Sequence, residues 1–209
     1  MFKVRWYPDN HPGEPVHKEV CKLRNEHTRE PGTGTDGRVK VINVTGDIEF
    51  DPRCREWCKL PYVGHPKGCP NFGKTDRCPP TAPLVTESMD LSREHYFVIH
   101  EFDLESHRNL MLEKHPGWTV RQANCVLYWQ RTQRKLLKEE CEKFITQTDP
   151  RMVHNFCPEA EGVNIFKILR RKGIKIVARP QKTVYMVALV GFPKNAISKI
   201  EAKKLTDFL

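Results

Sequence analysis

The chain has 209 residues, of which 38% are hydrophobic and 9% aromatic, a composition typical of a folded globular protein rather than a disordered one. Its longest apolar run, Val184 to Phe192, has the length of a strand. Because about 18–20 apolar residues are needed to span a bilayer, no membrane partner is expected. Lysine and arginine outnumber aspartate and glutamate by 35 to 26, which gives a net charge of +9 and favours anionic partners.

The N-terminal residues combine a strand signal with a long loop. Phe2 to Tyr7 alternates in character and is predicted to be a strand, whereas the polar residues 8–38, rich in Gly and Pro, predict a loop. No apolar core or cleavage site of a signal peptide is present, which predicts a cytoplasmic location. The loop contains three candidates for metal ligands at irregular spacing: His17, Cys21 and His27.

Two further strands and two helices are expected up to residue 146. Val39 to Val44 alternates and predicts a strand that leads into a cysteine-rich segment. After that segment, bulky apolar residues from 93 to 104 predict a buried strand, followed by a short helix from about Leu104 to Lys114. Residues 119–146 place apolar side chains at three- and four-residue steps, which predicts one long helix.

The remaining residues predict a loop, two helices and two strands. Residues 148–162 are expected to be irregular, and Val163 to Gly173 predicts a helix that ends at its glycine. Residues 174–192 predict two strands joined through Pro180 and Gln181. A last helix is expected from Asn195, which is a suitable N-cap.

This order of elements predicts a single α+β domain over residues 1–209. A mixed or antiparallel sheet is expected to be flanked by helices, with an irregular metal-binding loop at residues 52–82. That loop is too rich in Pro and Gly to form a regular helix or strand. Something other than backbone hydrogen bonding must therefore fix its shape.

The loop contains four of the eight cysteines, in the pattern C-x3-C-x10-C-x8-C: Cys54, Cys58, Cys69 and Cys78. In a reducing compartment, clustered cysteines indicate metal binding more often than disulfides. Structural zinc sites usually contain two closely spaced cysteine pairs, and only Cys54 and Cys58 form one here. Cys69 and Cys78 each precede proline, as iron–sulfur ligands frequently do. The pattern therefore favours a [4Fe–4S] cluster, with zinc as the alternative and disulfides or unligated thiols as the third interpretation.

The stretch GHPKGCPNFGKTDRCPP resembles the signature of a family of predicted metal-binding proteins of undefined function, in which GCPNYGK followed by CPP is typical. A second stretch, CPEAEGVNIFKILRRKGI from Cys157 to Ile174, resembles the C-terminal segment of that family. The resemblance implies a metal centre at the cysteines and implies no particular reaction. The family gathers more cysteines near the second stretch, whereas only Cys141 and Cys157 occur here. A second complete site is therefore not implied, and Cys157 is kept as a candidate extra ligand or reactive thiol, whereas Cys141 and Cys125 are expected to be structural.

Two basic stretches are candidates for binding RNA or another anionic partner. One is a stripe on the predicted long helix, formed by Arg131, Arg134, Lys135 and Lys138, and the other is Lys167 to Lys182, with seven basic and no acidic residues. The sequence thus predicts a metal-binding protein, in first place iron–sulfur, that acts in redox or sulfur-transfer chemistry with a redox partner or on RNA or another anionic substrate. The alternative is a zinc-stabilised nucleic-acid-binding module without catalysis. No catalytic residue is predicted, and the sequence does not decide whether the protein is an enzyme.

Overall fold

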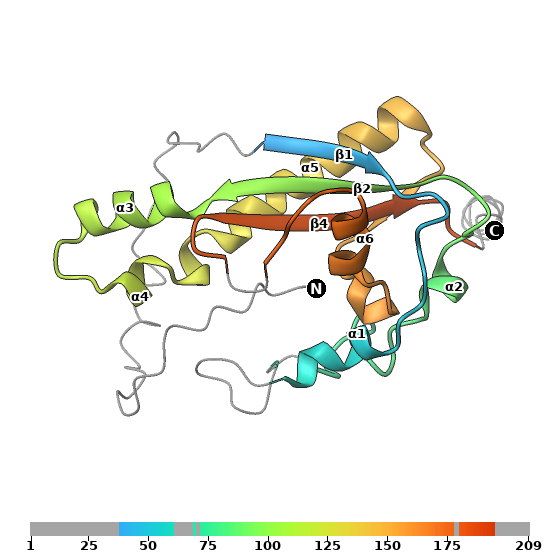
Figure 1. The fold of residues 1–209 in the computed structure, drawn as a ribbon, viewed down its shortest axis with the longest axis horizontal. Coiled ribbons are helices and arrows are strands. Elements are labelled where there is room, and N and C mark those ends of the chain that lie inside the picture. Colours follow the sequence, from blue (N-terminus) through green and yellow to red (C-terminus); the bar gives the residue numbers. More distant parts are fainter. Residues whose placement is uncertain (1–37, 61–68, 70–71, 178–179, 195–209) are drawn as a thin grey trace, which may run out of the picture.

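A computed structural model describes residues 38–60, 69, 72–177 and 180–194 (Figure 1). The strand predicted at Phe2–Tyr7, the helix predicted from Asn195 and the candidate ligands His17, Cys21 and His27 lie outside the described residues. None of the described helices is long and apolar enough to cross a membrane.

A four-stranded antiparallel sheet forms the centre of the fold, with the strand order β1-β2-β4-β3. Its strands are β1 (Arg38–Asn43), β2 (His95–Asp103), β3 (Val153–Asn155) and β4 (Thr183–Gly191). β2 and β4 pair over nine residues each, from His95 opposite Gly191 to Asp103 opposite Thr183. The predicted α+β class is thereby confirmed, and the sheet is antiparallel rather than mixed.

Both faces of the sheet are buried. Side chains of successive strand residues point to opposite faces, and a helix packs against each face. On one face, Phe97 and Leu189 pack in a core cluster with Leu169 of α6 (Ile165–Arg171). On the other face, Val98 packs in a second cluster with Leu137 of α5 (Gln130–Thr148). Figure 1 shows α6 in front of the strands and α5 behind them. The sheet therefore lies between these two helices.

The prediction of one long helix at residues 119–146 is wrong, because this part of the chain forms three separate helical elements. α4 (Val120–Ala123) is followed by the 3₁₀ turn η3 (Val126–Tyr128) and then by α5. The break lets the Trp129 ring stack on Phe102 of β2, with ring centroids 4.8 Å apart, and Trp129 is 3% exposed. α3 (Leu104–Lys114) lies where a short helix is predicted, and its N-cap Asp103 accepts a hydrogen bond from the Ser106 amide at 2.9 Å.

Two smaller predictions also differ from the structure. The residues Ile174 to Val177 are not a strand, since Ile174 and Ile176 pack onto the core cluster beside α6 instead of pairing with the sheet. The predicted loop at 148–162 contains the short strand β3 and the 3₁₀ turn η4 (Pro158–Glu161). β3 pairs only with Leu189 to Gly191 of β4, so its contribution to the sheet is short.

Candidate metal centre and cavity

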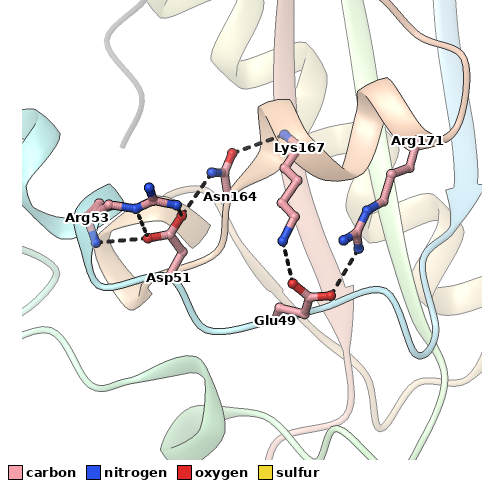
Figure 2. A network of polar contacts seen from close by, with 6 residues as sticks. All are labelled: Glu49, Asp51, Arg53, Asn164, Lys167 and Arg171. Atoms are coloured by element: carbon pink, nitrogen blue, oxygen red, sulfur yellow. Dashed lines mark hydrogen bonds and ion pairs between the residues drawn. The ribbon is translucent and has the colours of Figure 1, made fainter.

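A network of polar contacts fixes the start of the cysteine-bearing segment against α6 (Figure 2). Asn164, the N-cap of α6, accepts a hydrogen bond from the Lys167 amide at 3.0 Å and donates one to the Asp51 carboxylate at 3.1 Å. Asp51 also accepts hydrogen bonds from the guanidinium of Arg53 at 2.8 and 2.9 Å. The hydrogen bonds from Arg53 and Asn164 hold the pKa of Asp51 well below its usual range. The hydrogen bonds of the Asp51 side chain therefore fix the position at which the helical turn α1 (Arg53–Glu56), which contains Cys54, begins.

Arg55 joins three parts of the chain near the cysteines. Its guanidinium donates to the carbonyl oxygens of Pro80 and Ala82 at 3.0 and 2.8 Å, and to that of Pro83 at 3.2 Å. It also donates to the carbonyl oxygen of Ala160 in η4 at 2.8 Å. The five N–H groups of an arginine in one planar fork suit this many acceptors. Arg55 thus holds α1, residues 80–83 and η4 together.

Cys54 is buried, whereas the other three loop cysteines are half-buried. The side chain of Cys54 is 2% exposed, and burial, together with the charges of Asp51 and Glu159, raises its pKa to about 12. Cys58 lies one helical turn further on, at the 3₁₀ turn η2 (Trp57–Lys59). The Cys69 amide donates a hydrogen bond to the Cys58 carbonyl oxygen at 2.7 Å. The chain therefore brings Cys58 and Cys69 next to each other in spite of their separation in sequence.

Hydrogen-bond donors surround the sulfur of Cys78. Its Sγ lies 3.2 Å from the Thr75 Oγ1. Burial acts to raise the pKa of Cys78, but the Thr75 hydroxyl and the backbone amides of Gly73, Lys74 and Thr75 act against it, so that its pKa is lowered. Amide donors around a sulfur favour the thiolate, which is the form that binds metals.

Cys58, Cys69 and Cys78 line one cavity of about 910 Å³. Residues of α5 and Tyr185 to Val187 of β4 line the same cavity. Among the described residues, no strand pairs with these residues of β4 on the side of β3, because β3 ends earlier. The cavity therefore lies beside a part of β4 that no strand of the described residues covers on this side.

Cys157 also lines this cavity, although it lies 79 positions after Cys78. Its side chain is 6% exposed, and burial raises the pKa of its thiol. Cys141 is fully buried in the core against the sheet, as predicted, and Cys125 is the half-buried N-cap of η3; neither belongs to the cavity wall. Of the cysteines outside the loop that the structure describes, Cys157 alone joins the cavity.

The donor set suits a metal that binds sulfur, although its members are not gathered into a complete ligand sphere. Within the described ranges, no three histidine, cysteine, aspartate or glutamate side chains lie close enough together to hold a metal ion. No disulfide joins the described cysteines to one another. The shared cavity and the amide donors at Cys78 fit a thiolate-ligated centre, which requires the sulfurs to move closer together.

The basic stripe on α5 belongs to the same cavity, a relation that sequence spacing did not indicate. All four of its members line the wall: Arg131, Arg134, Lys135 and Lys138. The side chain of Arg134 is partly buried, and its Nη2 atom is buried without a hydrogen-bond partner among the described residues. Burial lowers the pKa of Arg134.

The second basic stretch, Lys167 to Lys182, is largely engaged in ion pairs within the molecule. Lys167 and Arg171 both contact the Glu49 carboxylate, at 2.6 and 3.1 Å, as Figure 2 shows. Lys172 lies 2.6 Å from Asp47, and Lys182 lies 3.8 Å from Glu105. These acidic residues come from distant parts of the chain, so the stretch that lacks acidic residues in sequence is not uniformly basic in space.

Glu159 is a buried acid near the cysteines that the sequence did not single out. Its side chain is 4% exposed, and its Oε2 atom has no hydrogen-bond partner among the residues described. Burial raises the pKa of Glu159 to about 7. The stretch from Cys157 to Ile174 contains Glu159, but its residue pattern does not distinguish a buried glutamate from an exposed one.

Comparison with protein-family models, with curated proteins and with solved structures finds no match to this chain. The site is therefore characterised by its own geometry: a cavity lined both by cysteines and by the basic residues of α5.

Proposed function

We propose that this chain binds a [4Fe–4S] cluster through the cysteines of residues 54–78 and uses it in redox or sulfur-transfer chemistry on an anionic substrate. The observation that carries the proposal is the convergence of Cys58, Cys69 and Cys78 on one cavity with the basic stripe of α5. A redox centre and an anion-binding wall in one cavity suit a reaction better than a purely structural metal.

The individual cysteines have different parts in this proposal. Cys58, Cys69 and Cys78 supply three thiolates from the cavity wall, and Cys54 supplies the fourth from one helical turn before Cys58. Cys157 lines the same cavity and is the candidate for an additional or replacement ligand. With four thiolates such a cluster serves one-electron transfer, whereas with three it leaves an iron open to substrate.

Zinc is the second candidate for the same ligands, and the observation that favours it is the position of Cys54 and Cys58 at the two ends of one helical turn. Such a pair is typical of structural zinc sites. In that case the metal would only stabilise the loop, and the basic stripe would serve nucleic-acid binding without catalysis.

Anaerobic purification followed by metal analysis and visible spectroscopy tests the proposal. A brown protein with iron, acid-labile sulfide and broad visible absorption is expected; a colourless protein with stoichiometric zinc would replace the cluster by the alternative. The variants Cys69→Ser and Cys78→Ser should each lose metal, whereas the matched control Cys125→Ser, outside the cavity wall, should retain it. Metal-free wild-type protein, or equal loss from the control, would contradict the ligand assignment.

A further inference from the structure

The basic and aromatic residues that line the cavity indicate which class of ligand it binds, which the cysteines alone do not. Arg134 of α5 lines this cavity, and its Nη2 atom is buried without a hydrogen-bond partner among the described residues. A guanidinium stays charged at neutral pH, and a buried N–H donor without a hydrogen-bond partner is unfavourable. The position of Arg134 is therefore best explained by an anionic ligand that is bound in the cavity.

The charge around Arg134 has one dominant sign. Six basic residues line the cavity, namely Lys74, Arg77, Arg131, Arg134, Lys135 and Lys138, and Asp76 carries the only carboxylate among the described lining residues. Lys135 and Lys138 form exposed ion pairs with Glu139 and Glu142, at 3.6 and 3.4 Å, which contribute little. Lys74, Arg77, Arg131 and Arg134 form no ion pair within the described part of the chain. This excess of positive charge suits a phosphate, which accepts several hydrogen bonds from arginine.

The rest of the wall is apolar and partly aromatic. Phe156, Phe166 and Tyr185 line it together with aliphatic residues of α6 and β4. The volume of about 910 Å³ lies in the range of roughly 300–1,000 Å³ that is usual for small-molecule sites. A phosphate ion alone would leave most of this space and all of the aromatic wall without contacts.

From these observations we infer that the cavity binds a nucleotide, with its phosphate at Arg134 and its base against the aromatic wall. Bases stack readily on phenylalanine and tyrosine, and the phosphate provides the negative charge that the basic wall requires. A free nucleotide and a nucleotide of a single-stranded RNA share this chemistry. The inference rests on the proposed function, because it names the substrate class of the same cavity.

Calorimetric titration of the protein as isolated separates the contributions of phosphate and base. AMP and UMP should bind more tightly than adenosine, uridine or inorganic phosphate, and a short single-stranded RNA distinguishes the two sources. Tighter binding of the RNA than of the mononucleotides identifies RNA as the ligand, whereas the reverse order identifies a free nucleotide. Nucleosides that bind as tightly as nucleotides would overturn the inference.

Arg134→Gln should weaken nucleotide binding by roughly tenfold to a hundredfold, the loss expected for a hydrogen bond to a charged group. Arg131→Gln, at an exposed position on the same wall, should give a smaller loss and remains informative if the first variant does not fold. Arg121→Gln, at an exposed arginine of α4 away from the cavity wall, is the matched control and should bind as the wild type does. RNA or nucleotide binding that survives both cavity variants would overturn the inference.

Metal content measured on the same samples keeps the two proposals apart. Full metal content without nucleotide binding by the wild type contradicts the nucleotide inference alone. Nucleotide binding by a wild-type protein that never contains metal contradicts the proposed cluster alone. Arg134→Gln should retain the metal content of the wild type, because Arg134 is not among the proposed ligands.

Discussion

The sheet and the cysteine-bearing segment are held in shape by different kinds of contact. β2 and β4 pair over nine residues each, and the side chains on both of their faces are buried. Residues 52–82, as far as they are described, contain only the short helical elements α1 and η2, and their position depends on individual side chains such as Arg55. The sheet is thus stabilised by many equivalent contacts, and the cysteine-bearing segment by a few specific ones.

The largest effect on stability is expected from a substitution that removes a large side chain from the core beside the sheet. Phe97 of β2 is completely buried in the core cluster that contains Leu169 of α6, so Phe97→Ala should lower the free energy of unfolding by about 3–5 kcal/mol. Val41→Ala, at a side chain of β1 that is 44% exposed, is the control and should cost less than about 0.5 kcal/mol. Guanidinium denaturation measures both; a similar loss in the two variants would mean that the sheet is not the stable part of the molecule.

An intermediate and local effect is expected at Arg55. Arg55→Ala leaves the carbonyl oxygens of Pro80, Ala82 and Ala160 without this donor, and should cost about 1–3 kcal/mol. Hydrogen exchange should accelerate at residues 72–83, whereas the amides of β2 and β4 should keep their protection.

Arg55→Lys tests whether the planar fork of donors is needed. A lysine presents its donors at a single nitrogen and cannot reach the acceptors in residues 80–83 and the acceptor in η4 at once, so most of the loss should remain. Uniform acceleration of exchange across the sheet in either variant would contradict the separation between the two regions.

The smallest effect is expected at Asp51, and it depends on pH. The hydrogen bonds from Arg53 and Asn164 lower the pKa of Asp51 in the folded protein, so its stabilising contribution is present above the ordinary aspartate pKa of about 4. That contribution is lost as the pH falls from above this value toward the lowered pKa. Asp51→Asn should therefore be less stable than the wild type at pH 7, by about 1 kcal/mol, and the difference should shrink at about pH 3.

Urea denaturation of Asp51→Asn and wild type at several pH values measures this difference. Asp76→Asn serves as a control, because Asp76 is exposed and forms no ion pair within the described residues. A difference between wild type and Asp51→Asn that grows toward low pH would contradict the lowered pKa of Asp51.

Elements with strong local signals could be predicted from the sequence. β2 follows from a run of bulky apolar residues, and α6 follows from its apolar spacing and from Gly173, which has a φ of +77° where the helix ends. The prediction of one long helix at residues 119–146 was wrong, because the packing of Trp129 on Phe102, a contact distant in sequence, overrides helical periodicity. Periodicity is a local property, and it cannot report such a contact.

Several residues of the cavity wall could be named from the sequence, but their arrangement could not. The cysteine spacing and the basic stripe were each visible in the sequence, but their meeting in one cavity depends on how α5 packs on the sheet. Cys157 was a weak candidate because no spacing rule connects it with Cys78. The ion pairs of Lys167 and Arg171 with Glu49 were likewise hidden, since they join residues more than 100 positions apart.

The position of β4 near the end of the described chain has a consequence for the order in which the site is made. Val187, the last of the described residues that line the cavity, lies 109 positions after Cys78. At a synthesis rate of about 5–20 residues per second, the cysteines precede that residue by roughly 5 to 20 seconds. During synthesis the thiols are therefore accessible before the sheet closes over them, and delivery of a metal to the nascent chain would not require the finished cavity to reopen.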